Sequence, residues 1–159
     1  MMLSKEQLLD ALQTVPDPEI PSVSIVDLGI ITSLEIEDQQ VKVTMTPTFV
    51  GCPAIEVMKQ GVEDVLKKLC SQYSVTVNYD IPWDSNRISE KGRQALKEFG
   101  LAPPPVYDTV LSLEILHMVS CPYCNSQNTY MQTPFGPTLC RSIHYCNSCL
   151  QAFEQFKPV

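Results

Sequence analysis

The 159-residue chain contains no apolar run close to the roughly 18 residues that a membrane-spanning helix requires. Residues 1–10 lack the continuous apolar stretch of a secretory signal peptide. Charged residues make up only 18% of the chain, but hydrophobic residues reach 44%, which is too apolar for extensive disorder. We therefore expect a folded, cytoplasmic protein with no membrane association, built as one domain or as a domain plus a small module.

The chain also has few basic residues. It carries 11 Lys and Arg against 18 Asp and Glu, which gives a net charge of −7 and an isoelectric point near 4.7. Nonspecific nucleic-acid binding needs a cationic surface that displaces counterions, so we expect no nucleic-acid partner. The charge is uneven, because residues 121–159 hold only one acidic residue. This change in composition indicates a separate C-terminal module.

Cysteine is the residue type that stands out, with seven in the chain and five of them within residues 121–159. In a reducing compartment such a cluster indicates metal binding rather than disulfides. Two C-x2-C pairs lie 21 residues apart and predict one tetrahedral four-thiolate site; their members are Cys121, Cys124, Cys146 and Cys149. Zinc in a structural role is favoured, and a rubredoxin-like iron site stays open.

Three further features of this module allow alternatives. Cys140 and His144 lie between the two pairs, and either can in principle replace a ligand, although packing roles are favoured for both. Asn125 follows the first pair and tolerates the left-handed backbone conformation that metal knuckles use, whereas Leu150 follows the second pair and tolerates it less well. Six of the chain's twelve aromatic residues lie in the module, which suits either a protein-binding surface or a small core.

The hydrophobic patterning of the rest of the chain predicts a small α+β domain over residues 1–102. Ser4 begins a helix with a capping-box spacing, and Ser89 and Gly100 bracket another helix. Alternating apolar residues predict a β-hairpin and a third strand. The expected helices cover residues 4–15, 53–70 and 89–99, and the expected strands cover residues 30–36, 41–46 and 75–79. Three consecutive prolines indicate a linker over residues 103–118, ahead of a zinc-ribbon-like module at 119–159.

Cys52 is the one cysteine of the first domain with a chemical reason for its position. It lies between Gly51 and Pro53 at the expected start of the second helix. The partial positive charge of a helix N-terminus stabilises a thiolate, so Cys52 is a candidate reactive thiol or metal ligand. A buried packing role is an equal alternative. A catalytic nucleophile would need a base, for which His117 is the candidate, and nothing in the sequence places it beside Cys52.

Polar residues flank Cys52 in the surrounding loops. Asp17 and Glu19 are separated by prolines that fix their backbone, and Asp27 follows ten residues later. Thr46 and Thr48 add hydroxyl groups shortly before Gly51. The carboxylates either line a functional site or simply cap loops, and the residue types alone favour loop capping.

These motifs resemble the iron–sulfur assembly domain family of the SufT and MIP type. The resemblance rests on separated motifs in a fixed order: residues 17–21 (DPEIP), 25–30 (IVDLGI), 46–53 (TPTFVGCP), 82–83 (PW), 89–93 (SEKGR) and 100–104 (GLAPP). The tail narrows it to the phenylacetate-degradation D family, also called the J-type oxygenase component, through residues 121–124 (CPYC), 133–138 (TPFGPT), 140–141 (CR) and 146–157.

The resemblance implies an iron–sulfur-assembly-type α/β sandwich followed by the zinc ribbon. It implies that Cys52 is the functional thiol, with Asp17, Glu19 and Asp27 near it. Members of the family are not catalytic themselves, and they are associated with a multicomponent phenylacetyl-CoA epoxidase. The implied partners are the flavin and iron–sulfur reductase subunit or the di-iron oxygenase subunit, with a transient iron or iron–sulfur cluster as cargo. The sequence leaves homo-oligomerisation open.

Overall fold

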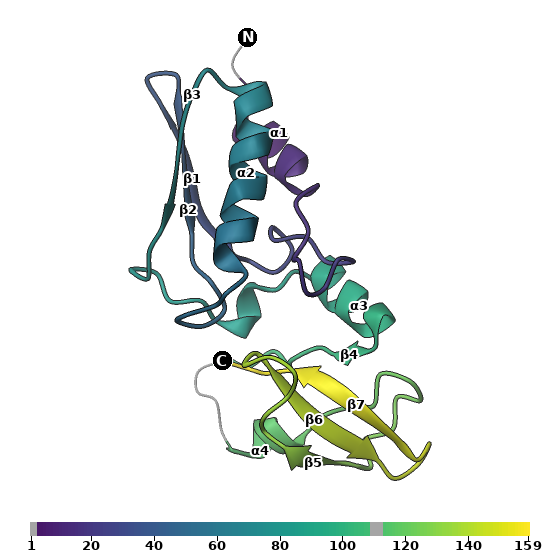
Figure 1. Cartoon of the computed structure of the whole chain (residues 1–159). Coiled ribbons are helices and arrows are strands. Elements are labelled where there is room, and N and C mark those ends of the chain that lie inside the picture. The colour runs from purple at the N-terminus through teal and green to yellow at the C-terminus, as the bar shows by residue number, and fades with distance from the viewer. Residues whose placement is uncertain (1–2, 109–112) are drawn as a thin grey trace. The chain divides into compact units, whose positions relative to one another are not determined.

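The computed structural model describes residues 3–108 and 113–159. The chain divides into two compact units, Met1–Trp83 and Asp84–Val159. Figure 1 shows a helix-covered sheet in the first unit and a smaller, strand-rich arrangement in the second.

The first unit is built on a three-stranded sheet with the order β1-β2-β3. Strands β1 (Ile31–Glu37) and β2 (Gln40–Met45) form the expected antiparallel hairpin, and β3 (Gln72–Val77) lies parallel to β2. Asp38 and Gln39 both have positive φ, which is the backbone geometry of a tight hairpin turn. A parallel pair needs a crossover connection, and here α2 (Ile55–Leu69) provides it.

Two helices cover one face of this sheet (Figure 1). Helix α1 (Lys5–Leu12) begins at Ser4 with the predicted capping box. The alternate β2 residues Val41, Val43 and Met45 are buried beneath the helices, while the β2 residues between them are half-buried. The sheet therefore has one apolar face and one more polar face, as expected of a two-layer α/β sandwich.

Three element boundaries differ from those expected. Helix α1 ends at Leu12 instead of residue 15, since the chain turns ahead of Pro16. Helix α2 begins at Ile55, because Pro53 and Ala54 form a turn and Ala54 offers no side-chain cap. Strand β3 begins three residues earlier and ends two residues earlier than expected, because its six residues pair in register with β2. After β3 the Asn78 N–H donates to the Met45 carbonyl, and the strand ends there.

The second unit contains a four-stranded sheet with the order β4-β7-β6-β5. Its elements are the 3-10 turn η1 (Ser85–Arg87), α3 (Glu90–Phe99), β4 (Leu101–Ala102), α4 (Leu113–His117), β5 (Thr129–Thr133), β6 (Arg141–Cys146) and β7 (Gln151–Phe156). Strands β5, β6 and β7 form an antiparallel meander, and β4 adds to it parallel to β7. Helix α3 has Ser89 as N-cap and a left-handed Gly100 past its end, as predicted.

The structure groups residues 84–105 with the ribbon, whereas the sequence pattern placed a boundary at residue 102. Two contacts account for this grouping. Strand β4 extends the ribbon sheet beside β7, and the Ser85 N–H donates to the Val159 carbonyl at 3.0 Å. Within residues 84–105, the buried Arg93 guanidinium donates to the carbonyls of Pro104 and Ser85. The proline stretch is therefore held against α3 by specific hydrogen bonds. Within the expected linker, residues 109–112 lie outside the described residues.

Candidate metal centre and thiol loop

The four cysteines of the two C-x2-C pairs converge at one point in the second unit. Their sulfur atoms all lie within 4.8 Å of one another. The Cys121 and Cys149 sulfurs are 3.7 Å apart, and those of Cys124 and Cys146 are 3.5 Å apart. Thiolates about 2.3 Å from one tetrahedral ion have sulfurs roughly 3.8 Å apart, so the donor set fits a single metal ion.

Each pair is shaped as a metal knuckle. The residues that follow the pairs, Asn125 and Leu150, both have φ of 60°. The Asn125 N–H donates to the Cys121 carbonyl at 2.9 Å, and the Leu150 N–H donates to the Cys146 carbonyl at 3.0 Å. Leu150 thus adopts the left-handed conformation although a branched apolar side chain disfavours it. The knuckle hydrogen bond and the metal geometry determine the backbone at this position.

Backbone N–H groups also point at the sulfurs. The N–H groups of Cys149 and Ser148 donate to Cys146, and they lower the pKa of that thiol to about 6. Burial beside the other cysteines raises the pKa of Cys149 to about 12. Four thiols this close repel one another when they ionise, so a bound cation would compensate the charge of their thiolate forms.

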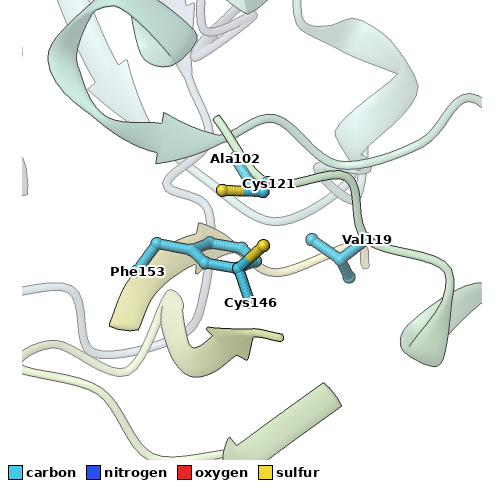
Figure 2. Packing of buried hydrophobic residues seen from close by; sticks show 5 residues of the cluster. All are labelled: Ala102, Val119, Cys121, Cys146 and Phe153. Carbon is cyan, nitrogen blue, oxygen red and sulfur yellow. The ribbon is translucent and has the colours of Figure 1, made fainter. Parts of the chain in front are cut away.

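The metal centre has a dry side. Cys121 and Cys146 belong to a buried cluster with Ala102, Val119 and Phe153, which Figure 2 shows from close by. Four protein thiolates leave no ligand position for a substrate. The cluster joins β4, β6 and β7 to the segment before the first pair.

Cys140 and His144 do not join this group of four. Cys140 is half-buried with its sulfur 3.1 Å from the Thr138 hydroxyl. His144 is fully buried, stacks on Phe153, and has its Nε2 3.0 Å from the Ser142 hydroxyl. Burial lowers the pKa of His144, which keeps the ring neutral at pH 7. Both side chains thus have packing roles.

Cys52 lies on the loop between β2 and α2, with its side chain half-buried. Gly51 has φ of 85°, a conformation that requires glycine, and it sets the direction of the chain into Cys52. The Cys52 carbonyl accepts the Ile55 N–H at 3.4 Å, so Cys52 precedes the first turn of α2. The thiol is therefore next to a helix N-terminus but not inside it.

Asp17 and Asp27, which the family resemblance implies lie near Cys52, both have hydrogen-bond partners within the first unit. Asp17 Oδ1 accepts the N–H groups of Glu19 and Ile20 at 2.8 and 2.9 Å, which caps the proline loop. Asp27 accepts from the Ser24 hydroxyl at 3.1 Å and lies 3.5 Å from the Gln13 amide. Both aspartates are buried. Asp17 thus caps its loop, while the Asp27 carboxylate accepts from the side chains of Ser24 and Gln13.

The remaining residues of the pattern are distributed around the same end of the sheet. Thr46 is buried, and its hydroxyl lies 3.1 Å from that of Thr32. Thr48 is half-buried, and Glu19 is exposed. Over residues 3–108 and 113–159, the four ribbon cysteines are the only cluster of three or more potential metal ligands. Cys52 and the acidic residues therefore do not form a complete metal site within one chain.

Sequence reasoning assigned no contact to Trp83, which joins two segments at the same end of the sheet. Its side chain is buried, and its indole N–H donates to the Leu28 carbonyl at 2.8 Å. The contact joins the segment after β3 to the loop before β1 across 55 residues of sequence. The advance signals were that Trp83 is the single tryptophan of the chain and that it belongs to the PW motif of the family resemblance.

The comparisons with known proteins match both units. Residues 5–79 fit the family model "Iron-sulfur cluster assembly protein", and residues 110–157 fit "PaaD zinc beta ribbon domain". The chain is 31% identical over 149 residues to the Escherichia coli K12 protein named as the D component of a "Putative 1,2-phenylacetyl-CoA epoxidase", covering 93% of this chain and 89% of that protein. It is 33% identical over 95 residues to an "Fe-S protein maturation auxiliary factor" of Bacillus subtilis strain 168, covering 58% of this chain and 92% of that one.

Two solved structures are similar to the first part of the chain. A domain of unknown function, DUF59, from Bacillus anthracis is 30% identical with a TM-score of 0.54, covering 58% of this chain and 90% of that one. A conserved hypothetical protein from Thermotoga maritima is 33% identical with a TM-score of 0.51, covering 63% and 97%. Among the described residues, no helix has the length and apolar character needed to span a bilayer.

The Escherichia coli protein matches along nearly its whole length, and each of the two units has its own family model. The chain therefore belongs to the family of the phenylacetyl-CoA epoxidase D component, in which an iron–sulfur-assembly-type unit precedes a four-cysteine ribbon.

Proposed function

We propose that this chain is an accessory maturation component of the multicomponent phenylacetyl-CoA epoxidase, and that it assists the assembly of an iron or iron–sulfur centre. One observation carries the proposal. The chain is similar to the epoxidase D component along nearly its whole length, and its first unit is also similar to two Fe-S maturation auxiliary factors. The client would be the iron–sulfur and flavin reductase subunit or the di-iron oxygenase subunit. The metal centre would be assembled in the cytoplasm, and the chain would not itself catalyse the oxygenation of phenylacetyl-CoA.

In this proposal Cys52 is the functional thiol, and it holds iron or a cluster only transiently. Gly51 turns the backbone with a positive φ directly before Cys52, and α2 begins three residues after Cys52. Fewer than three potential ligand atoms of one described chain gather there. A cluster held by Cys52 would take its other ligands from a client or from a second copy of the chain. An incomplete site of this kind favours handing the cargo over rather than keeping it.

The ribbon's role in the proposal is structural, with zinc held by Cys121, Cys124, Cys146 and Cys149. The sulfur spacings, the knuckle backbone and the N–H groups directed at the thiolates all support a tightly held ion. A second candidate function is a zinc-ribbon adaptor that docks on an epoxidase subunit without handling metal. The exposed ribbon side chains Tyr123, Phe135 and Leu150 favour that alternative, because large exposed apolar residues are typical of binding surfaces.

The test measures metal and acid-labile sulfide per chain after anaerobic purification of the wild type, Cys52→Ser and Cys70→Ser. Cys70 is the matched control, because it is the other half-buried cysteine of the first unit. We expect one zinc in all three proteins, with additional iron and sulfide in the wild type and in Cys70→Ser only. Equal iron and sulfide in Cys52→Ser would remove Cys52 from the mechanism.

A second readout uses a host that lacks its own copy of the gene and grows aerobically on phenylacetate. We expect Cys52→Ser to fold normally and to leave the epoxidase inactive for want of its metal centre. Full epoxidase activity with this variant would contradict metal handling and would leave the adaptor function.

A further inference from the structure

The first unit exposes four large apolar side chains at the end of the sheet where Cys52 lies. Val50 is 78% exposed in the loop after β2, and Val57 is 61% exposed in the first turn of α2. Tyr79 and Ile81 are 48% and 41% exposed in the segment after β3. Since β2 and β3 are parallel, these segments leave the sheet at the same end (Figure 1). Exposed apolar residues gathered in this way are typical of interaction sites.

The basic residues of the first unit are absent from one end of the sheet, whereas the other end carries lysines together with the acidic residues Glu6, Glu35, Glu37 and Asp38. The three segments that reach the Cys52 end are residues 16–30, 46–57 and 78–83, and they contain five acidic residues but no Lys, Arg or His. The opposite end carries four of the unit's five lysines, which are Lys5, Lys42, Lys67 and Lys68. A cavity of about 280 Å³ at that opposite end is lined jointly by α1, the hairpin and the end of α2, which shows that these elements meet there.

We propose that this thiol end, defined by Val50, Val57, Tyr79 and Ile81 with Glu56 and Asp80, docks an apolar, positively charged segment of a partner protein. The inference rests on the proposed function, since the docked partner would be the recipient of what Cys52 carries. Apolar contact supplies affinity, and the acidic residues select and orient the partner. Docking beside the thiol also provides the ligands that one chain lacks.

Two other occupants fit the observations less well. A hydrated iron ion would be attracted by the acidic residues, but it would gain nothing from contact with four exposed apolar side chains. A second copy docked through the same surface would place two acidic ends against each other, which is repulsive. A copy docked by its lysine-bearing end offers little attraction, because Glu6, Glu35, Glu37 and Asp38 at that end offset its four lysines.

The experiment places the photocrosslinking residue p-benzoylphenylalanine at position 50 of the full chain, in a host that lacks its own copy and grows on phenylacetate. The control position is 72, which is exposed at the start of β3 and so at the opposite end. Each is combined with the neutralising pair Glu56→Gln and Asp80→Asn. The matched control pair is Glu35→Gln and Asp38→Asn, which removes the same charge near the hairpin turn.

We expect position 50, and not position 72, to crosslink a partner through a peptide of net positive charge. Neutralising Glu56 and Asp80 lowers the yield about tenfold, as for charges at an interface rim, and the hairpin pair leaves it unchanged. Equal yields at both positions, a neutral or acidic peptide, no crosslink, or a crosslink to a second copy would each overturn the docking inference. The partner's identity tests the proposed function separately, because a basic peptide from a protein outside the epoxidase supports the surface but contradicts the client.

Discussion

Removing the metal should unfold the second unit and leave the first unit intact. The two units are of similar length, but their apolar cores are not equal. Of the described residues, 17 large apolar side chains are buried within Met1–Trp83, against six within Asp84–Val159, which are Ile88, Leu96, Leu101, Val119, Phe153 and Phe156. Burying six such side chains contributes roughly 9–18 kcal/mol before conformational entropy is subtracted.

A four-thiolate zinc ion contributes about 10–16 kcal/mol to the folding of a small module. Whole domains have a net stability of only about 5–15 kcal/mol. The free energy lost with the ion is therefore as large as or larger than the net stability expected for the second unit, so the unit should unfold. In the first unit no described group of residues forms a comparable metal site, so its stability should not respond to a zinc chelator.

The assay is a two-dimensional amide NMR spectrum of the full chain before and after chelation, and of the variant Cys146→Ser. We expect dispersed signals from the second unit to collapse, while those of β1, β2 and β3 persist. Cys140→Ser is the matched control, since this cysteine belongs to the same module but lies outside the group of four. Dispersed and exchange-protected signals from β6 and β7 after complete loss of metal would refute the reasoning.

Three smaller changes test contacts in the first unit. Gly61→Ala would place a methyl group 2.8 Å from a Val15 methyl, so we expect a loss of about 1 kcal/mol in the free energy of unfolding, measured with urea, despite the higher helix propensity of alanine. Trp83→Phe removes the indole N–H that serves a buried carbonyl, and it should cost about 1–3 kcal/mol in the same assay. Lys42→Met removes the ammonium that holds the pKa of Glu37 below its ordinary value, so an NMR titration should show that pKa rising; an unchanged value would contradict the ion pair. A more stable Gly61→Ala protein would show that Val15 moves aside freely, and an unaltered Trp83→Phe protein would show that the hydrogen bond carries no energy.

Much of the fold was encoded in local sequence signals. Ser4 and Ser89 act as N-caps, and Gly100 ends α3, because these positions depend on hydrogen bonds and φ angles within a few residues. The β1–β2 hairpin follows from the alternation of apolar residues, which is also local. The group of four cysteines could likewise be predicted from the sequence, since each C-x2-C pair forms its own knuckle within a few residues.

Tertiary structure decided what depends on distant partners. The unit to which α3 belongs depends on β4 pairing with β7 and on the Ser85 N–H reaching the Val159 carbonyl, neither of which appears in local patterning. The limits of β3 are set by its register with β2, which lies about 30 residues earlier in the chain.

The same division holds around the candidate thiol. The sequence by itself determined that Cys52 follows a glycine ahead of a helix and that acidic residues flank it in the chain. Only the folded chain decided that the Asp17 carboxylate caps a loop and that the Asp27 carboxylate accepts from Ser24, and that the apolar residues after β2 and β3 emerge at one end of the sheet. Local propensity acts over a few residues, whereas the parallel crossover of α2 brings together segments that sequence order keeps apart.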